Sequence, residues 1–327
     1  MRRILLVHDE REHLGGAETL LRELTAALRQ QELEVAWAHD RVPQAVADFQ
    51  PDFVCCLTVI VKVGLGALEW LQWQKVPHCL VLVDYWPQCT QRNLVHLSRG
   101  DICQTCGGDC PSGAPSPHVR EIVNRSPVVA LNPYQVEINQ RFGIRTDTWL
   151  PCGLDTTFWQ PDLGRPAVPV RVMASTAWSQ QTYGNIWWKG EQYLRLLERD
   201  LGITVHGITG VPRTAVRDAL RAGHIYVFPS VWDESWGYCL LEAMACGLAC
   251  VAFDQAGARH LLAGSAGVLV ERGNYEALRD AVAELLADPD RQVQLGRRAA
   301  AKVRAFWGLG SIGQIWRRYF EQVREAA

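Results

Sequence analysis

Residues 225–247 read IYVFPSVWDESWGYCLLEAMACG, and this stretch decides the fold. Its first part, Ile225 to Phe228, is a continuous apolar run of the kind that forms a buried strand. A polar loop containing Gly237 follows. The segment Tyr238 to Cys246 then has the composition of a helix, ended by Gly247 at a position where a left-handed cap is common. A strand, a loop and a helix in this order are the unit of a parallel α/β sheet.

The same pattern extends through the whole chain. In the first half a helix is predicted at Glu18 to Gln31, and apolar runs predict strands at Ile4–His8, Leu33–His39, Pro51–Leu57, His78–Val83 and Pro127–Leu131. In the second half strands are predicted at Val170–Ala174, Ile203–His206, Ala249–Phe253 and Gly267–Val270, and helices at Gly190–Arg199, Pro212–Ala222, Tyr275–Leu286, Arg291–Phe306 and Ser311–Ala327. We therefore expect two doubly wound, Rossmann-like α/β domains facing a cleft.

The length supports two domains, because 327 residues exceed the size at which one hydrophobic core usually keeps growing. The stretch Gln160 to Pro169 carries three prolines and is interpreted as a linker. We place the first domain at residues 1–160 and the second at 161–327, with the last helix packing back toward the first domain. Ligands of such sheets bind beyond the carboxyl ends of the strands, so the cleft is the expected place for chemistry.

The charge balance excludes some partners. Thirty-three basic and 35 acidic side chains give a net charge of −2, which argues against recognition of nucleic acid mainly through its phosphate backbone. The net charge does not exclude a small local patch of basic residues. The N-terminal apolar run, Ile4 to Val7, is too short for a signal peptide or a membrane span. We therefore expect no membrane span and a cytoplasmic location.

Two carboxylates in the opening stretch are candidates for ligand binding. Glu234 lies in a loop before a helix whose first N–H groups and dipole favour an anion, as a diphosphate cradle would. Glu242 lies among apolar helix residues, where a lone carboxylate is costly unless hydrogen-bonded, and a ribose diol offers two donors. The alternative is that Glu242 faces solvent and that Glu234 only occupies the first turn of the helix.

These residues resemble the E-x7-E signature of family 4 retaining glycosyltransferases of the GT-B fold, over about 25 residues from Phe228 to Ala252. The similarity extends to four further motifs, which are Gly15-Gly16-Ala17-Glu18, Pro51-Asp52, Gly153-Leu154-Asp155 with Phe158, and Lys189-Gly190.

The resemblance implies a role for each matching position. Glu242 would hold the ribose of a nucleotide-sugar donor, Glu234 with Ser235, Trp236 and Gly237 would contact the transferred sugar, and Lys189 would neutralise the diphosphate. Gly15 and Gly16 could bring backbone N–H groups close to a phosphate or an acceptor hydroxyl. The sequence does not assign a general base. Asp84, which follows the end of a strand, is the best candidate for that role.

The implied reaction is transfer of a hexosyl-type group from a UDP- or GDP-sugar to an acceptor hydroxyl with retained anomeric configuration and without a catalytic metal. Two alternatives stay open, a nucleotide-sugar epimerase of the same fold and a non-catalytic binding protein with a degenerate transferase fold. The donor base, the donor sugar and the acceptor cannot be read from the sequence.

The sequence departs from the family pattern at several positions. Gly184 stands where members usually have an arginine, Val83 where they commonly have a histidine, and His260 near the place of an acidic residue. Only one strand, Ile203 to His206, is predicted where relatives often have two. Phosphate contacts would therefore fall to backbone amides and Lys189.

Four of the eleven cysteines lie in a polar, Gly-rich insertion at about residues 89–117, and they are Cys89, Cys103, Cys106 and Cys110. Their spacing is typical of a structural zinc site, which would order a loop without its own core. Free thiols, a redox pair and an iron–sulfur centre are the alternatives, and His96 or His118 could replace one cysteine. Because the insertion follows Asp84 in the first domain, we expect it to border the acceptor side of the cleft.

Overall fold

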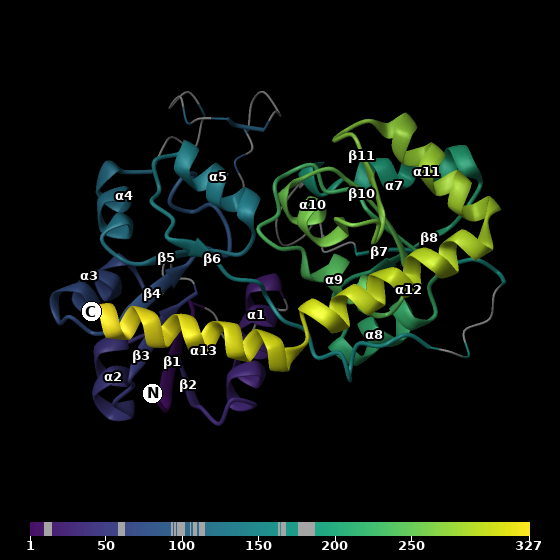
Figure 1. Ribbon diagram of the computed structural model, residues 1–327. Coiled ribbons are helices and arrows are strands. Elements are labelled where there is room, and N and C mark those ends of the chain that lie inside the picture. Colours follow the sequence, from purple (N-terminus) through teal and green to yellow (C-terminus); the bar gives the residue numbers. More distant parts are fainter. Residues whose placement is uncertain are drawn as a thin grey trace. The chain divides into compact units, whose positions relative to one another are not determined.

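The computed structural model describes residues 1–9, 15–57, 63–92, 94, 96, 102–104, 106, 110, 115–162, 164, 168–175 and 187–327. The chain forms two compact units, which are Met1–Gly153 with Leu309–Ala327, and Leu154–Gly308 (Figure 1). We call them unit 1 and unit 2. Each contains one sheet of parallel strands with helices packed on it, so the predicted fold class of two α/β domains is confirmed.

The sheet of unit 1 has six parallel strands in the order β2-β1-β3-β4-β5-β6. Their bounds are β1 Arg3–Val7, β2 Glu34–Ala38, β3 Phe53–Cys56, β4 His78–Val81, β5 Val128–Ala130 and β6 Thr148–Trp149. The strands β1, β3, β4 and β5 are almost wholly buried, as continuous apolar runs in a covered parallel sheet require.

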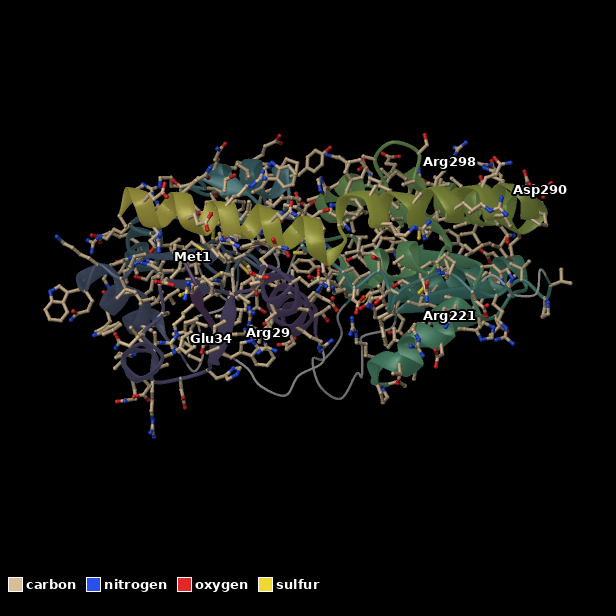
Figure 2. The ribbon with its side chains drawn as sticks, turned by 60° about the horizontal axis from the view of Figure 1, so that its bottom comes forward. Met1, Arg29, Glu34, Arg221, Asp290 and Arg298 are labelled. Carbon is tan, nitrogen blue, oxygen red and sulfur yellow. The ribbon has the colours of Figure 1, made fainter. Side chains whose placement is uncertain are left out.

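The helices of unit 1 are α1 Gly16–Arg29, α2 Val42–Phe49, α3 Leu65–Trp73, α4 Pro117–Asn124, α5 Pro133–Arg141 and α13 Leu309–Ala326. The end of α1 lies beside the start of β2, where Arg29 donates to the carbonyl of Val35 at 3.3 Å (Figure 2). The last helix, α13, packs along α1. Its Trp316 is fully buried and donates to the carbonyl of Pro151 at 2.9 Å, which fixes α13 on unit 1.

The sheet of unit 2 has five parallel strands in the order β11-β10-β9-β7-β8. Their bounds are β7 Val172–Ser175, β8 Val205–Ile208, β9 Ile225–Phe228, β10 Ala249–Phe253 and β11 Val268–Val270. The helices are the 3₁₀ turn η1 Trp187–Lys189, α7 Glu191–Leu201, α8 Arg213–Arg221, α9 Tyr238–Ala245, α10 Ala256–Leu262, α11 Tyr275–Ala287 and α12 Pro289–Phe306. Gly247 follows α9 with a φ of +76°, as the sequence predicts for a left-handed cap.

Both sheets are wound in the same way. In each, the first strand of the unit is flanked by the second on one side and the third on the other, so the winding reverses between β1 and β3 and between β7 and β9. Ligands of doubly wound sheets bind at the carboxyl ends of the strands at such a reversal. None of the described helices is both long and apolar enough to cross a bilayer.

Candidate functional site

Glu234 is the centre of a polar cluster in unit 2, in the loop that joins the carboxyl end of β9 to α9. Its side chain is only 11% exposed, and its atom Oε1 accepts three hydrogen bonds. The donors are Lys189 Nζ at 2.5 Å, Trp232 Nε1 at 2.7 Å and Ser230 Oγ at 3.0 Å. A buried carboxylate without donors would be costly, so this convergence explains how Glu234 stays buried.

Lys189 reaches Glu234 because the backbone brings two loops together. Gly190 follows Lys189 with a φ of +86°, and a Cβ atom there would lie 2.0 Å from the carbonyl oxygen of Pro229. Next to this contact, Val231 N donates to Trp188 O at 2.8 Å. Only glycine fits this approach, and its absent side chain explains why the Lys-Gly pair and the β9–α9 loop lie side by side.

Two further contacts fix the backbone around Glu234. The Glu234 amide donates to Oε1 of Gln255 at 3.0 Å, and the amide of Gly257 donates to the same oxygen at 2.9 Å. Asp233 is paired with the Arg272 guanidinium and accepts a hydrogen bond from Ala256 N at 3.0 Å. The loop is therefore held to the start of α10 at Asp233 and at the amide of Glu234.

Glu242 and the end of β7 lie near the same cluster. Burial raises the pKa of the Cys239 thiol to about 11, and the negative charge of Glu242 adds to this rise, whereas the Lys189 ammonium opposes it. The hydroxyl of Ser175, the last residue of β7, contacts Cys239 and accepts a hydrogen bond from Tyr226 at 2.8 Å. Glu242 is half-buried. Cys239, in the first turn of α9, thus lies within electrostatic range of Glu242, Lys189 and Glu234.

The predicted residues Ser235, Trp236 and Gly237 directly precede α9. Gly237 caps the helix in the left-handed region, with a φ of +98° and no side-chain cap. Trp236 is 2% exposed and packs on His260 and Trp307, with ring centroids 5.4 and 5.7 Å away. Burial lowers the pKa of His260 to about 4, and the charge of Lys302 adds to this effect. The Trp236 side chain is thus a packing element, and only its backbone remains as a possible ligand contact.

Gly15 and Gly16 lie in unit 1 at the start of α1, and both are exposed. The amide of Gly15 already donates to Oε2 of Glu18 at 2.9 Å, in a capping box. Glu18 also bonds Nε2 of His8 at 3.2 Å. One backbone amide of the predicted Gly-Gly loop, that of Gly15, therefore already donates to the carboxylate of Glu18.

Asp84 also lies in unit 1, three residues after β4. Its atom Oδ2 accepts from Arg92 Nε at 2.9 Å, and Oδ1 accepts from Trp86 N at 2.9 Å. Burial raises the pKa of Asp84, Arg92 opposes the rise, and the charge of Asp9 adds to it. Asp9, two residues after β1 and 5% exposed, was not singled out from the sequence.

The four cysteines of the predicted zinc site are all described, with Cys106 exposed and Cys89, Cys103 and Cys110 half-buried. Among the described residues, no group of three or more His, Cys, Asp or Glu side chains is placed to hold a metal ion. The structure does not support the zinc site, which stays a prediction from spacing alone.

Elemental analysis of the purified protein tests that prediction. The spacing predicts one zinc per chain, lost in a Cys103→Ser/Cys106→Ser variant, because both changes remove thiolate ligands. Metal-free protein whose four thiols all react with an alkylating reagent would show that the spacing is misleading.

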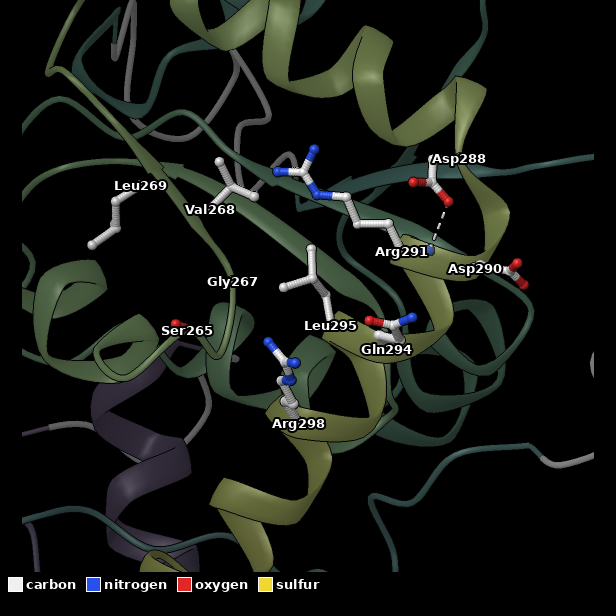
Figure 3. A pocket seen from close by; sticks show the side chains of 10 residues that line it. All are labelled: Ser265, Gly267, Val268, Leu269, Asp288, Asp290, Arg291, Gln294, Leu295 and Arg298. Atoms are coloured by element: carbon white, nitrogen blue, oxygen red, sulfur yellow. Dashed lines mark hydrogen bonds between the residues drawn. The ribbon is translucent and has the colours of Figure 1, made fainter.

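A separate hollow of about 740 Å³ lies in unit 2 where β11 begins and α12 starts (Figure 3). It is lined by Ser265, Gly267, Val268, Leu269, Asp288, Asp290, Arg291, Gln294, Leu295 and Arg298. These residues belong to β11, the turn before it, and the first turns of α12, whereas Glu234 follows the carboxyl end of β9. None of the described residues that line the hollow is a predicted site residue.

The structure thus brings Lys189, Glu234 and the start of α9 together in unit 2, and places Gly15, Gly16 and Asp84 in unit 1. Gly184 and the stretch 176–183 lie outside the described residues. Sequence reasoning missed Ser230, Trp232 and Gln255, whose contacts with Glu234 depend on the fold of the loop.

Comparison with known proteins points to one class. Residues 187–302 match the family model described as Glycosyl transferases group 1. A GDP-mannose-dependent monoacylated alpha-(1-6)-phosphatidylinositol monomannoside mannosyltransferase of Corynebacterium glutamicum is 28% identical over 130 residues, which are 38% of this chain and 34% of that relative. The chain matches about a third or less of the length of such curated relatives.

Two solved structures resemble the whole chain. Sucrose-phosphate synthase of Thermosynechococcus elongatus has a TM-score of 0.74 at 15% identity, with full coverage of both chains. HepE of Anabaena, in complex with UDP-glucose, has a TM-score of 0.67 at 17% identity, covering 100% of this chain and 99% of that one. The fold is therefore the GT-B fold of glycosyltransferases, and the segment with the Lys189–Glu234 cluster carries the sequence pattern of their group 1.

Proposed function

We propose that the protein is a glycosyltransferase that moves a hexosyl-type group from a UDP- or GDP-sugar to an acceptor hydroxyl with retained anomeric configuration. The observation that carries this proposal is the Lys189–Glu234 pair beside the start of α9, at the carboxyl ends of β7 and β9. That is where a doubly wound sheet binds its ligands. The GT-B fold and the match of residues 187–302 support the same activity.

The charges of the cluster suit a nucleotide diphosphate. The ammonium of Lys189 and the positive end of the α9 dipole would stabilise the negative charge that grows on the departing diphosphate. Glu242 would accept hydrogen bonds from the ribose hydroxyls. Among the described residues, none donates a hydrogen bond to Oε2 of Glu234, so this oxygen can accept one from a hydroxyl of the transferred sugar.

Unit 1 would supply the acceptor side. Asp84, whose pKa is raised by burial, is the carboxylate that we propose to act as a base toward the acceptor hydroxyl. Arg92 holds it in place through Oδ2.

The test is a screen of several UDP- and GDP-sugars for slow hydrolysis, followed by NMR. We expect release of free sugar from at least one donor, first as the anomer present in that donor. Conversion of the sugar nucleotide to its epimer would indicate an epimerase, and binding without any turnover would indicate a non-catalytic protein. Either result contradicts the proposed activity.

A further inference from the structure

We propose that Trp232 is a positioning residue of this site, which holds the carboxylate of Glu234 and the ammonium of Lys189 in register. The inference rests on the proposed function. It concerns a residue that lies outside the E-x7-E positions, and it follows from the contacts of one side chain.

The indole of Trp232 makes two different contacts. Its Nε1–H donates to Oε1 of Glu234 at 2.7 Å, and Nζ of Lys189 lies over its ring, 4.8 Å from the ring centroid. Lys189 in turn bonds the same carboxylate oxygen at 2.5 Å. The three groups therefore contact one another in pairs.

These contacts leave Oε2 as the carboxylate oxygen that can bind the sugar. With Oε1 occupied by donors from Trp232, Lys189 and Ser230, the plane of the carboxylate is fixed, and Oε2 has a defined direction. Without the indole N–H the carboxylate can rotate about its last bond, whose torsion is broad in glutamate. A sugar held by a rotated carboxylate is misplaced, which lowers turnover more than it lowers nucleotide affinity.

The two contacts can be separated by substitution. Trp232→Phe keeps an aromatic face for Lys189 and removes the N–H donor, whereas Trp232→Gln keeps an N–H donor and removes the ring. Trp159→Phe is the matched control, because Trp159 is 1% exposed in the same unit and its Nε1 has no hydrogen-bond partner among the described residues.

The experiment measures kcat and KM for donor hydrolysis and, by calorimetry, the Kd of UDP and GDP. Because the lost hydrogen bond goes to a charged group, kcat of Trp232→Phe should fall about tenfold or more with an unchanged nucleotide Kd. Loss of the ring should raise the Kd of Trp232→Gln about threefold or more, since Lys189 loses its cation–π contact. The control should match the parent in both quantities.

A kcat of Trp232→Phe equal to that of the parent overturns the positioning role. A crystal structure of the same variant gives a readout that does not depend on activity. It should show the Glu234 carboxylate turned from its orientation in the parent, and an unmoved carboxylate also overturns the inference. If the parent hydrolyses no nucleotide sugar, the proposed function fails, and the crystal structure still decides the role of Trp232.

Discussion

Glu242 offers the sharpest test at the level of a single residue. If its carboxylate binds the ribose, Glu242→Ala leaves two hydroxyls of the nucleotide without acceptors and should weaken UDP or GDP binding by about 1 to 3 kcal/mol. Glu276→Ala, which removes an exposed glutamate of α11 in the same unit, is the control and should bind like the parent. Isothermal titration measures both. Unchanged affinity in Glu242→Ala would remove Glu242 from the donor site.

Gly190 tests how closely the two loops of the site must approach. An alanine at Gly190 or at Gly202 would carry the left-handed backbone strain of about 1 to 2 kcal/mol. Only at Gly190 would the new Cβ also collide with Pro229 O, since nothing lies within 4 Å of a Cβ at Gly202. Gly190→Ala should therefore have the lower midpoint of urea-induced unfolding and the weaker nucleotide binding. Equal midpoints for the two variants would contradict this close approach.

The sequence predicted which charged residues belong to the site, but not which atoms they contact. Glu234 and Lys189 are separated by 45 positions, so no local spacing shows that they pair at 2.5 Å. The roles of Trp232 and Gln255 are hidden for the same reason. A tryptophan in a polar loop and a glutamine after a strand give no signal until the loop has folded around a buried carboxylate.

Among the helices, α13 shows how one element stabilises unit 1. Trp316→Ala removes a fully buried ring and its hydrogen bond to Pro151, and should lower the free energy of unfolding by about 3 to 5 kcal/mol. Ile315→Ala, on the 37% exposed neighbouring residue, should cost less than about 1 kcal/mol. Thermal unfolding of both variants measures the difference. Similar losses of unfolding free energy in the two variants would show that the buried ring of Trp316 contributes little to the stability of unit 1.

The strands and the longer amphipathic helices are predicted from the sequence, and most of the short helices are not. The strands appear as apolar runs because both faces of each sheet are covered. Helices α2, α3, α4, α5 and α10 were missed, and each has nine residues or fewer. A cap does not separate them from the predicted helices, because side chains cap α4, α5 and α10 whereas none caps α9. Short helices carry few repeats of the helical apolar period and therefore only a weak sequence signal.

At the scale of the whole molecule, the sheets of both units reverse their strand order in the same way. The predicted site residues lie partly in one unit and partly in the other. Lys189, Glu234 and Glu242 lie in unit 2, and Gly15, Gly16 and Asp84 lie in unit 1. The fold class was predictable because the apolar periodicity that indicates each strand or helix is a signal summed over many residues. The acceptor was not predictable, because no motif in the sequence identifies side chains that would recognise it.

We propose that the diphosphate of a sugar nucleotide binds at Lys189, and titration of UDP and GDP into the parent and into Lys189→Ala tests this most directly. Arg195→Ala is the control for loss of one positive charge, because the exposed side chain of Arg195 pairs with Glu191 on α7. We predict that Lys189→Ala loses about 1.5 to 3 kcal/mol of nucleotide affinity while Arg195→Ala keeps it. Nucleotide affinity that is unchanged in Lys189→Ala, or absent in the parent, would contradict this claim.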